Sequence, residues 1–177
     1  KCRISLCDVY HEQNDLESAK THLNDALTLI RQTGRETYSG FVVENMKSLA
    51  LMLDVCKDGA QADLLIDQSL RRFRRLRNEA VEKQLEALKA YLVLRRGEDM
   101  SQANRWAQTS GLSTEDKITY LDEFNHVVFV RSLIARGQAK QALPLLNRLL
   151  KCAQEGSRGR TVIEILLRYT IFNFFYF

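Results

Sequence analysis

Proline, glycine and strand-like patterns are scarce in this sequence, and their scarcity limits the possible folds. The chain has one proline and eight glycines in 177 residues, and each glycine lies near a plausible helix boundary or connection. Runs of β-branched residues with period-two alternation are missing, which excludes a strand-rich architecture. We therefore expect an all-α protein.

Residues that would carry catalysis or bind a metal also lack the required spacing. No two of the three histidines stand four residues apart, Cys7 and His11 form the single cysteine–histidine pair at that spacing, and the four cysteines form no C-x-x-C pair. The sequence has no G-x-x-x-x-G-K-[ST] phosphate loop, no nucleophile elbow and no DNA-recognition helix of the helix-turn-helix kind. We expect no enzymatic activity, no cofactor and no metal site. His126 is expected to be a hydrogen-bonded core residue, and the cysteines to be buried, reduced thiols.

Neither charge of one sign nor long apolar runs dominate the chain. Its 26 basic and 22 acidic residues are interspersed, with a net charge of +4, as on solvated helix faces. The densest basic run, Arg71 to Arg77, has a face that phosphates could meet, although a solvated outer face is the simpler interpretation. The last nine residues are nearly all apolar, but they are too few to span a bilayer as a helix. With no signal peptide pattern, we expect a cytoplasmic protein that binds neither membranes nor nucleic acid directly.

One helical pattern recurs along the chain. Around Gly137 two apolar helical faces follow one another, and on the second face Ala142 is followed by leucines at helical spacing. The same small-then-large signature occurs at Ala103, Ala62 and Ala19, with offsets of 39, 41 and 43 residues. The recurrence predicts a single repeat domain of about nine helices, with repeats at about 1–34, 35–77, 78–111 and 112–156 and a terminal helix at 158–177.

Local signals suggest where some of these helices begin. Asp15 is placed to cap the second helix, and Ser113 with Asp116 resembles a capping box that starts the fourth pair. Pro144 is tolerated without cost only if its helix begins at about Gln141. The terminal helix has no expected partner helix within the chain, so we expect a truncated array, a self-association surface or a tail folded back on the last pair.

The aligned hairpins resemble the tetratricopeptide (TPR) repeat, with its 34-residue period stretched to about 40 residues. This resemblance implies a right-handed α-α superhelix whose first helices line a concave groove. Ala90-Tyr91 departs from the large–small order of that family on the first helix. A small residue opens the second helix of each pair, as in that family, at Ala19, Ala62, Ala103 and Ala142.

Longer strings, such as NDLESAKTHLNDALTLIRQTG and RWAQTSGLSTEDKITYLDEFNHVVFVRSLIARGQAKQALPLLNRLL, carry a more specific resemblance. They are similar to the superhelical sensor region of large LuxR-family, ATP-dependent transcriptional activators of the MalT type. In that family a nucleotide-binding module precedes this region and a DNA-binding helix-turn-helix follows it. The resemblance implies a fragment of a larger regulator that senses a small-molecule inducer or a protein partner. The alternative is a freestanding TPR scaffold unrelated to transcription.

The TPR repeat also predicts which side chains face the groove. We expect Lys47, Arg95 and Arg131 to share one concave wall in three successive hairpins. Exposed charges on helices are more often merely solvated, which is the alternative for each position. The candidate ligand- or partner-binding residues are Glu44, Lys47, Asp54, Leu92, Arg95, Phe124 and Arg131.

Overall fold

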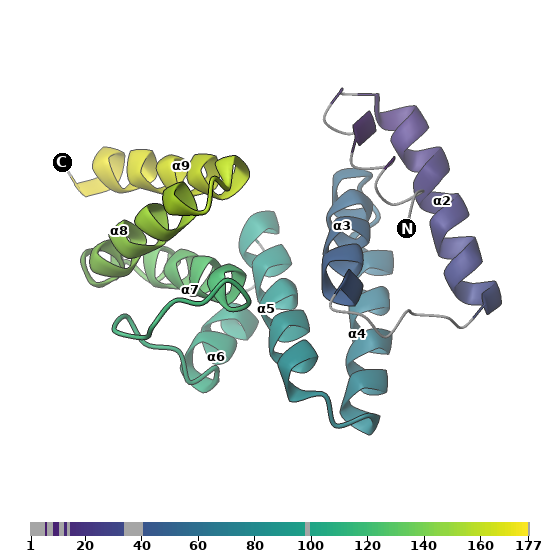
Figure 1. The fold of residues 1–177 in the computed structure, drawn as a ribbon, viewed down its shortest axis with the longest axis horizontal. Coiled ribbons are helices and arrows are strands. Elements are labelled where there is room, and N and C mark those ends of the chain that lie inside the picture. The colour runs from purple at the N-terminus through teal and green to yellow at the C-terminus, as the bar shows by residue number, and fades with distance from the viewer. Residues whose placement is uncertain are drawn as a thin grey trace. The chain divides into compact units, whose positions relative to one another are not determined.

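A computed structural model of the chain describes residues 6, 9–10, 13, 15–33, 41–97 and 100–176. In these residues there is no strand, so the all-α prediction is confirmed (Figure 1). Residues 6 and 9–10 are helical, and the rest of the first expected helix lies outside the described residues. The eight helices of the described ranges are α2 (Leu16–Thr33), α3 (Phe41–Val55), α4 (Gly59–Arg75), α5 (Glu79–Arg96), α6 (Ser101–Thr109), α7 (Glu123–Ala135), α8 (Ala139–Glu155) and α9 (Gly159–Tyr176).

Contacts divide the chain into two compact units, residues 1–85 and 86–177, with the boundary inside α5. In the first unit α3 and α4 form a hairpin, and α2 packs against α3. The expected small-then-large pairs are buried there, Ala19 with Leu23 and Ala62 with Ile66. Asp15 caps α2 as expected, because its Oδ1 accepts from the Ser18 amide at 3.1 Å. Hydrogen bonding from the Ser18 side chain, together with this bond from its amide, lowers the pKa of the Asp15 carboxyl.

Four connections between consecutive helices share one three-residue turn. The middle residue of each turn has a positive φ, and the third residue donates its amide hydrogen to a carbonyl five residues earlier, a Schellman-like end to the helix. Only one of these left-handed positions is a glycine. Gly59 begins α4 behind Asp58, whose side chain accepts from the Gln61 amide. The left-handed residues are Lys57, Arg77, Gly137 and Ser157.

The second unit is built around α7. Nine of its thirteen residues are buried, and α7 contacts α6, α8 and α9. The small residues predicted to allow close helix approach, Ala103 and Ala142, are both buried in this core. His126 is also buried, and its Nδ1 donates to the Asp122 carbonyl at 2.9 Å, so the expected hydrogen-bonded core histidine is confirmed.

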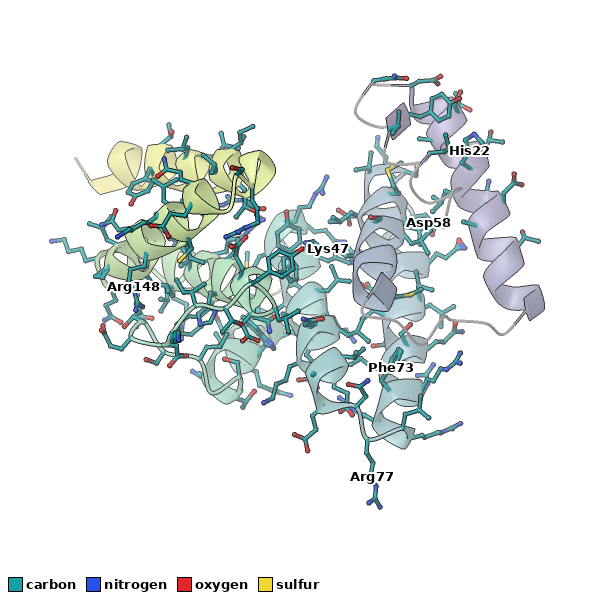
Figure 2. The ribbon with its side chains drawn as sticks, viewed as in Figure 1. His22, Lys47, Asp58, Phe73, Arg77 and Arg148 are labelled. Atoms are coloured by element: carbon teal, nitrogen blue, oxygen red, sulfur yellow. The ribbon has the colours of Figure 1, made fainter. Side chains whose placement is uncertain are left out.

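The predicted start of the fourth pair at Ser113 is wrong, since α7 begins only at Glu123. Asp116 Oδ2 does accept from the Ser113 amide at 2.8 Å, and Ser113 Oγ accepts from the Glu115 amide at 3.0 Å. These bonds close a turn by themselves and need no helix behind them. Arg148 on α8 holds this turn by donating to the carbonyl oxygens of two of its residues (Figure 2).

Pro144 lies inside α8, which begins at Ala139 rather than at Gln141. Its missing amide hydrogen therefore removes the bond that the Lys140 carbonyl would otherwise accept. Lys140 is exposed, so water can replace that partner at small cost.

Helix α9 packs on both α8 and α7, so the expectation that it has no partner helix is wrong. It folds back on the last pair and buries Ile165 in the core of the second unit. Its other side exposes Ile163, Leu166 and Leu167. Within the described part of the chain, no helix is both long enough and apolar enough to cross a membrane.

Candidate functional site

Helices α5, α7 and α9 bring five side chains together into what we call the arginine cluster: Tyr91, Phe124, Arg131, Glu164 and Arg168. The guanidinium carbon of Arg131 lies 4.3 Å from the centroid of the Tyr91 ring, within the range of a cation–π interaction. The Tyr91 and Phe124 rings are 5.6 Å apart and tilted by 45°. Two aromatic rings therefore border a charged group that is held in one place.

Helical spacing explains why these side chains meet. Phe124 and Arg131 are two turns apart on α7, and Glu164 and Arg168 are one turn apart on α9, so each pair shares a helix face. On α5, Arg95 follows Tyr91 by one turn and extends the same face. The cluster thus rests on rigid helices rather than on a loop, which suits a binding surface.

Two guanidinium groups in the cluster share one carboxylate. Glu164 Oε1 lies 3.5 Å from Arg131 Nη1 and 3.9 Å from Arg168 Nη2. The side chains of Arg131 and Arg168 are only 11% and 20% exposed. Burial and the nearby Arg131 charge together lower the pKa of Arg168. The cluster therefore carries an excess positive charge in a partly desolvated place.

One hydrogen-bond donor of the cluster is unused. Nε of Arg168 is buried and has no hydrogen-bond partner within the described ranges. A buried donor left without an acceptor costs free energy. An acceptor that reached Arg168 would recover that free energy.

A second arginine–carboxylate contact, the Arg158–Glu123 pair, lies at the other end of α7. Arg158 donates from Nε to Glu123 Oε1 at 3.1 Å and from Nη2 to Oε2 at 2.5 Å, and Nη2 also donates to the Cys152 carbonyl. The Glu123 side chain is only 8% exposed. This two-pronged contact gives each carboxylate oxygen a charged donor, so it fastens the α8–α9 turn to the start of α7.

The sequence of these repeated hairpins matches a known protein family. The model of the MalT-like TPR region family matches residues 2–171. The chain belongs to this family. No curated protein and no solved structure matches it.

The candidate residues of this MalT-like TPR region are distributed over both units. Phe124 and Arg131 meet in the arginine cluster, and the exposed Arg95 lies on the same face of α5 as Tyr91. Lys47 and Asp54 are half-buried residues of α3 in the first unit. Glu44 belongs to α3, but its side chain lies outside the described residues.

The expectation for Leu92 is corrected by its burial. None of its surface is exposed, so it offers nothing to a ligand. A step of one residue along a helix turns the side chain by about 100°. Leu92 therefore points about 100° away from Tyr91 and into the core, although it stands only three residues from Arg95.

The sequence analysis did not identify three residues of the arginine cluster: Tyr91, Glu164 and Arg168. A signal for Tyr91 existed, because it stands where the TPR pattern expects a small residue. Arg168 follows Arg131 by 37 residues, as Arg131 follows Arg95 by 36. Extending the repeat spacing into the terminal helix would have indicated Arg168 as well.

The arginines of the basic run from Arg71 to Arg77 are exposed except for the half-buried Arg72, while Phe73 is buried, as a solvated outer face requires. Arg77 projects away from the helices (Figure 2). A hollow of about 370 Å³ on α4 is lined by Gln68, Arg71, Arg72, Arg75 and Leu76. No group of three or more potential metal ligands occurs where the structure is described.

Proposed function

We propose that this MalT-like TPR region is the sensor and protein-interaction domain of a LuxR-type, ATP-dependent transcriptional regulator in the cytoplasm. It binds a small-molecule inducer or a partner protein and passes its bound state to modules outside this chain. The observation that carries the proposal is the arginine cluster, in which three helices present aromatic and charged side chains together. Such a surface can recognise a ligand.

Membership of the family supports the proposal, because arrays of helical hairpins use their first helices as binding surfaces. Arg95, Arg131 and Arg168 recur at nearly one repeat length on α5, α7 and α9. A strip of cations at repeat spacing suits a ligand or partner segment longer than a single contact. The rigid helical support means that little conformational entropy is lost when the ligand binds.

The gene around this region tests the proposal directly. We expect it to encode a phosphate-loop motif before the region and a helix-turn-helix after it, because ATP-dependent control of a promoter needs both. An intact gene without either module would support a freestanding TPR scaffold and contradict the proposed role in transcription.

A further inference from the structure

We infer that the arginine cluster is a binding site for a carboxylate group, provided by a small-molecule inducer or by an acidic side chain of a partner protein. The inference rests on the proposed function and names the chemistry that this function recognises. It depends on the contacts of Arg131, Glu164 and Arg168.

The charges of the cluster favour an anion. Arg131 and Arg168 together carry two positive charges, and Glu164 neutralises only one of them. Both arginines are mostly buried, so water screens the remaining charge less than it would on an open surface. A bound carboxylate would make the cluster neutral.

The geometry of the donors also favours a carboxylate. Glu164 contacts both arginines through the same oxygen at 3.5 and 3.9 Å, longer than the 2.7–2.9 Å of a charge-assisted hydrogen bond. The Arg158–Glu123 pair shows the shorter contacts, at 3.1 and 2.5 Å, of a two-pronged arginine–carboxylate pair in this unit. By that standard Arg131 and Arg168 retain donors for a second carboxylate, including Nε of Arg168, which has no partner among the residues that the structure describes.

The aromatic rings beside the arginines set the shape of the ligand. Tyr91 lies under the Arg131 guanidinium and contacts Phe124 at its side. A flat or apolar group next to the carboxylate would pack on these rings. Benzoate combines both features and is a suitable probe, with benzyl alcohol as its uncharged counterpart.

Titration of the full chain with sodium benzoate, at an ionic strength fixed with sodium chloride, tests the inference. The readout is the NMR signals of the arginine Nε–Hε groups. We expect saturable shifts for Arg131 and Arg168, none for the exposed Arg105 on α6, and no response to benzyl alcohol. Equal shifts of all arginines would indicate general screening and overturn the inference.

Two substitutions in the cluster should change benzoate affinity in opposite directions, and a third substitution outside it is the control. Arg168→Gln should weaken benzoate binding by at least about tenfold, whereas Arg105→Gln, with the same change in net charge, should leave it unchanged. Glu164→Gln should tighten binding by about tenfold, because it removes the internal carboxylate that competes with the ligand. A merely structural role for Glu164 would give no tightening, and that result would overturn the inference.

The source of the carboxylate is distinguished by a second probe. An N-acetylated, glutamate-rich peptide that shifts the same two arginines at lower concentration than benzoate would assign the site to a partner protein. The reverse order would assign it to a small molecule, and both results support the carboxylate site. The gene context tests the transcription role separately, so a failed titration with both flanking modules present would refute the carboxylate site alone.

Discussion

The two ends of helix α7 use arginine and glutamate in different ways. At its start, Glu123 is buried and receives two hydrogen bonds from Arg158, which also donates to a backbone carbonyl. Two turns from Phe124, Arg131 shares Glu164 with Arg168 through longer contacts. We call the first the complete end, because both oxygens of Glu123 receive short hydrogen bonds from Arg158. We call the second the incomplete end, because Arg131 and Arg168 share one oxygen of Glu164 at longer distances.

This difference teaches how a repeat domain separates folding from binding. A satisfied ion pair stabilises a connection but presents no donor to a ligand, while an unsatisfied arginine pair keeps donors available at some cost in stability. Under the proposed function, the same residue types would serve structure at one end and recognition at the other. Substitutions at the two ends should therefore affect different measurements.

The largest expected effect comes from breaking the complete end. Glu123→Gln should lower the free energy of unfolding by about 2–3 kcal/mol, below the value for a fully buried pair because Arg158 is partly exposed. Glu164→Gln, the same change at the other end, should cost less, about 1–2 kcal/mol, because the contacts of Glu164 at 3.5 and 3.9 Å are longer. Urea unfolding of both variants measures the difference, and equal costs would contradict the contrast between the two ends.

The core that holds both ends in place provides the next test. Ala142 is buried on α8 against this core, so Ala142→Leu should overfill it and destabilise by about 1–3 kcal/mol. Lys140→Ala on the exposed side of α8 is the control and should have almost no effect. If the two variants had equal melting temperatures, Ala142 would lie outside the core and the alignment of the repeats would be wrong.

Gly156 lies next to the Arg158–Glu123 pair, and its substitution tests how much that pair contributes to stability. A Cβ added to Gly156 would lie 1.6 Å from Nη1 of Arg158, so Gly156→Ala should displace the guanidinium and cost about 1–2 kcal/mol. A Cβ at Gly159, three residues later, would meet nothing within 4 Å, and Gly159→Ala is the control. Thermal melting of the pair measures the effect. An unchanged melting temperature for Gly156→Ala would show that the Arg158 contact contributes little to stability.

The smallest stability effect is expected at the incomplete end. Replacing Arg95 and Arg131 together with alanine should weaken carboxylate binding by at least about tenfold, or 1.4 kcal/mol. From the sequence alone we expect a nearly unchanged melting temperature. The structure adds a loss of about 1 kcal/mol in the free energy of unfolding, because the aliphatic part of the Arg131 side chain is buried beside Tyr91. An Arg71/Arg74/Arg75 triple alanine variant should bind normally by the same titration. If only the triple variant lost binding, the functional surface would be the exposed face of α4.

The helices and the core could be predicted because each repeat buries one stripe of apolar residues at helical spacing. Ala62 and Ala142 show this, as both are buried where the pattern places them. The start of α7 could not be predicted in this way. Hydrogen bonds between Ser113 and Asp116 look the same in sequence whether they cap a helix or close a turn, and only the packing of the following residues decides.

The candidate site was predictable only in part. Phe124 and Arg131 followed from repeat spacing, while the contribution of Glu164 depends on how α9 folds against α7. Leu92 shows the limit of the spacing argument, because a shift of one residue moves a side chain from a surface to the core. Tyr91 marks the opposite case, where a departure from the repeat pattern coincides with the candidate site, as functional positions often do.

The most direct test of the contrast between the two ends measures stability and benzoate binding on two variants with the same charge change. Arg158→Gln should lower the unfolding midpoint and leave benzoate affinity unchanged, because it breaks only the complete pair. Arg168→Gln should lower the affinity by at least about tenfold and change the midpoint little. If each variant altered both measurements to the same extent, the separation of structural and recognition roles along α7 would be contradicted.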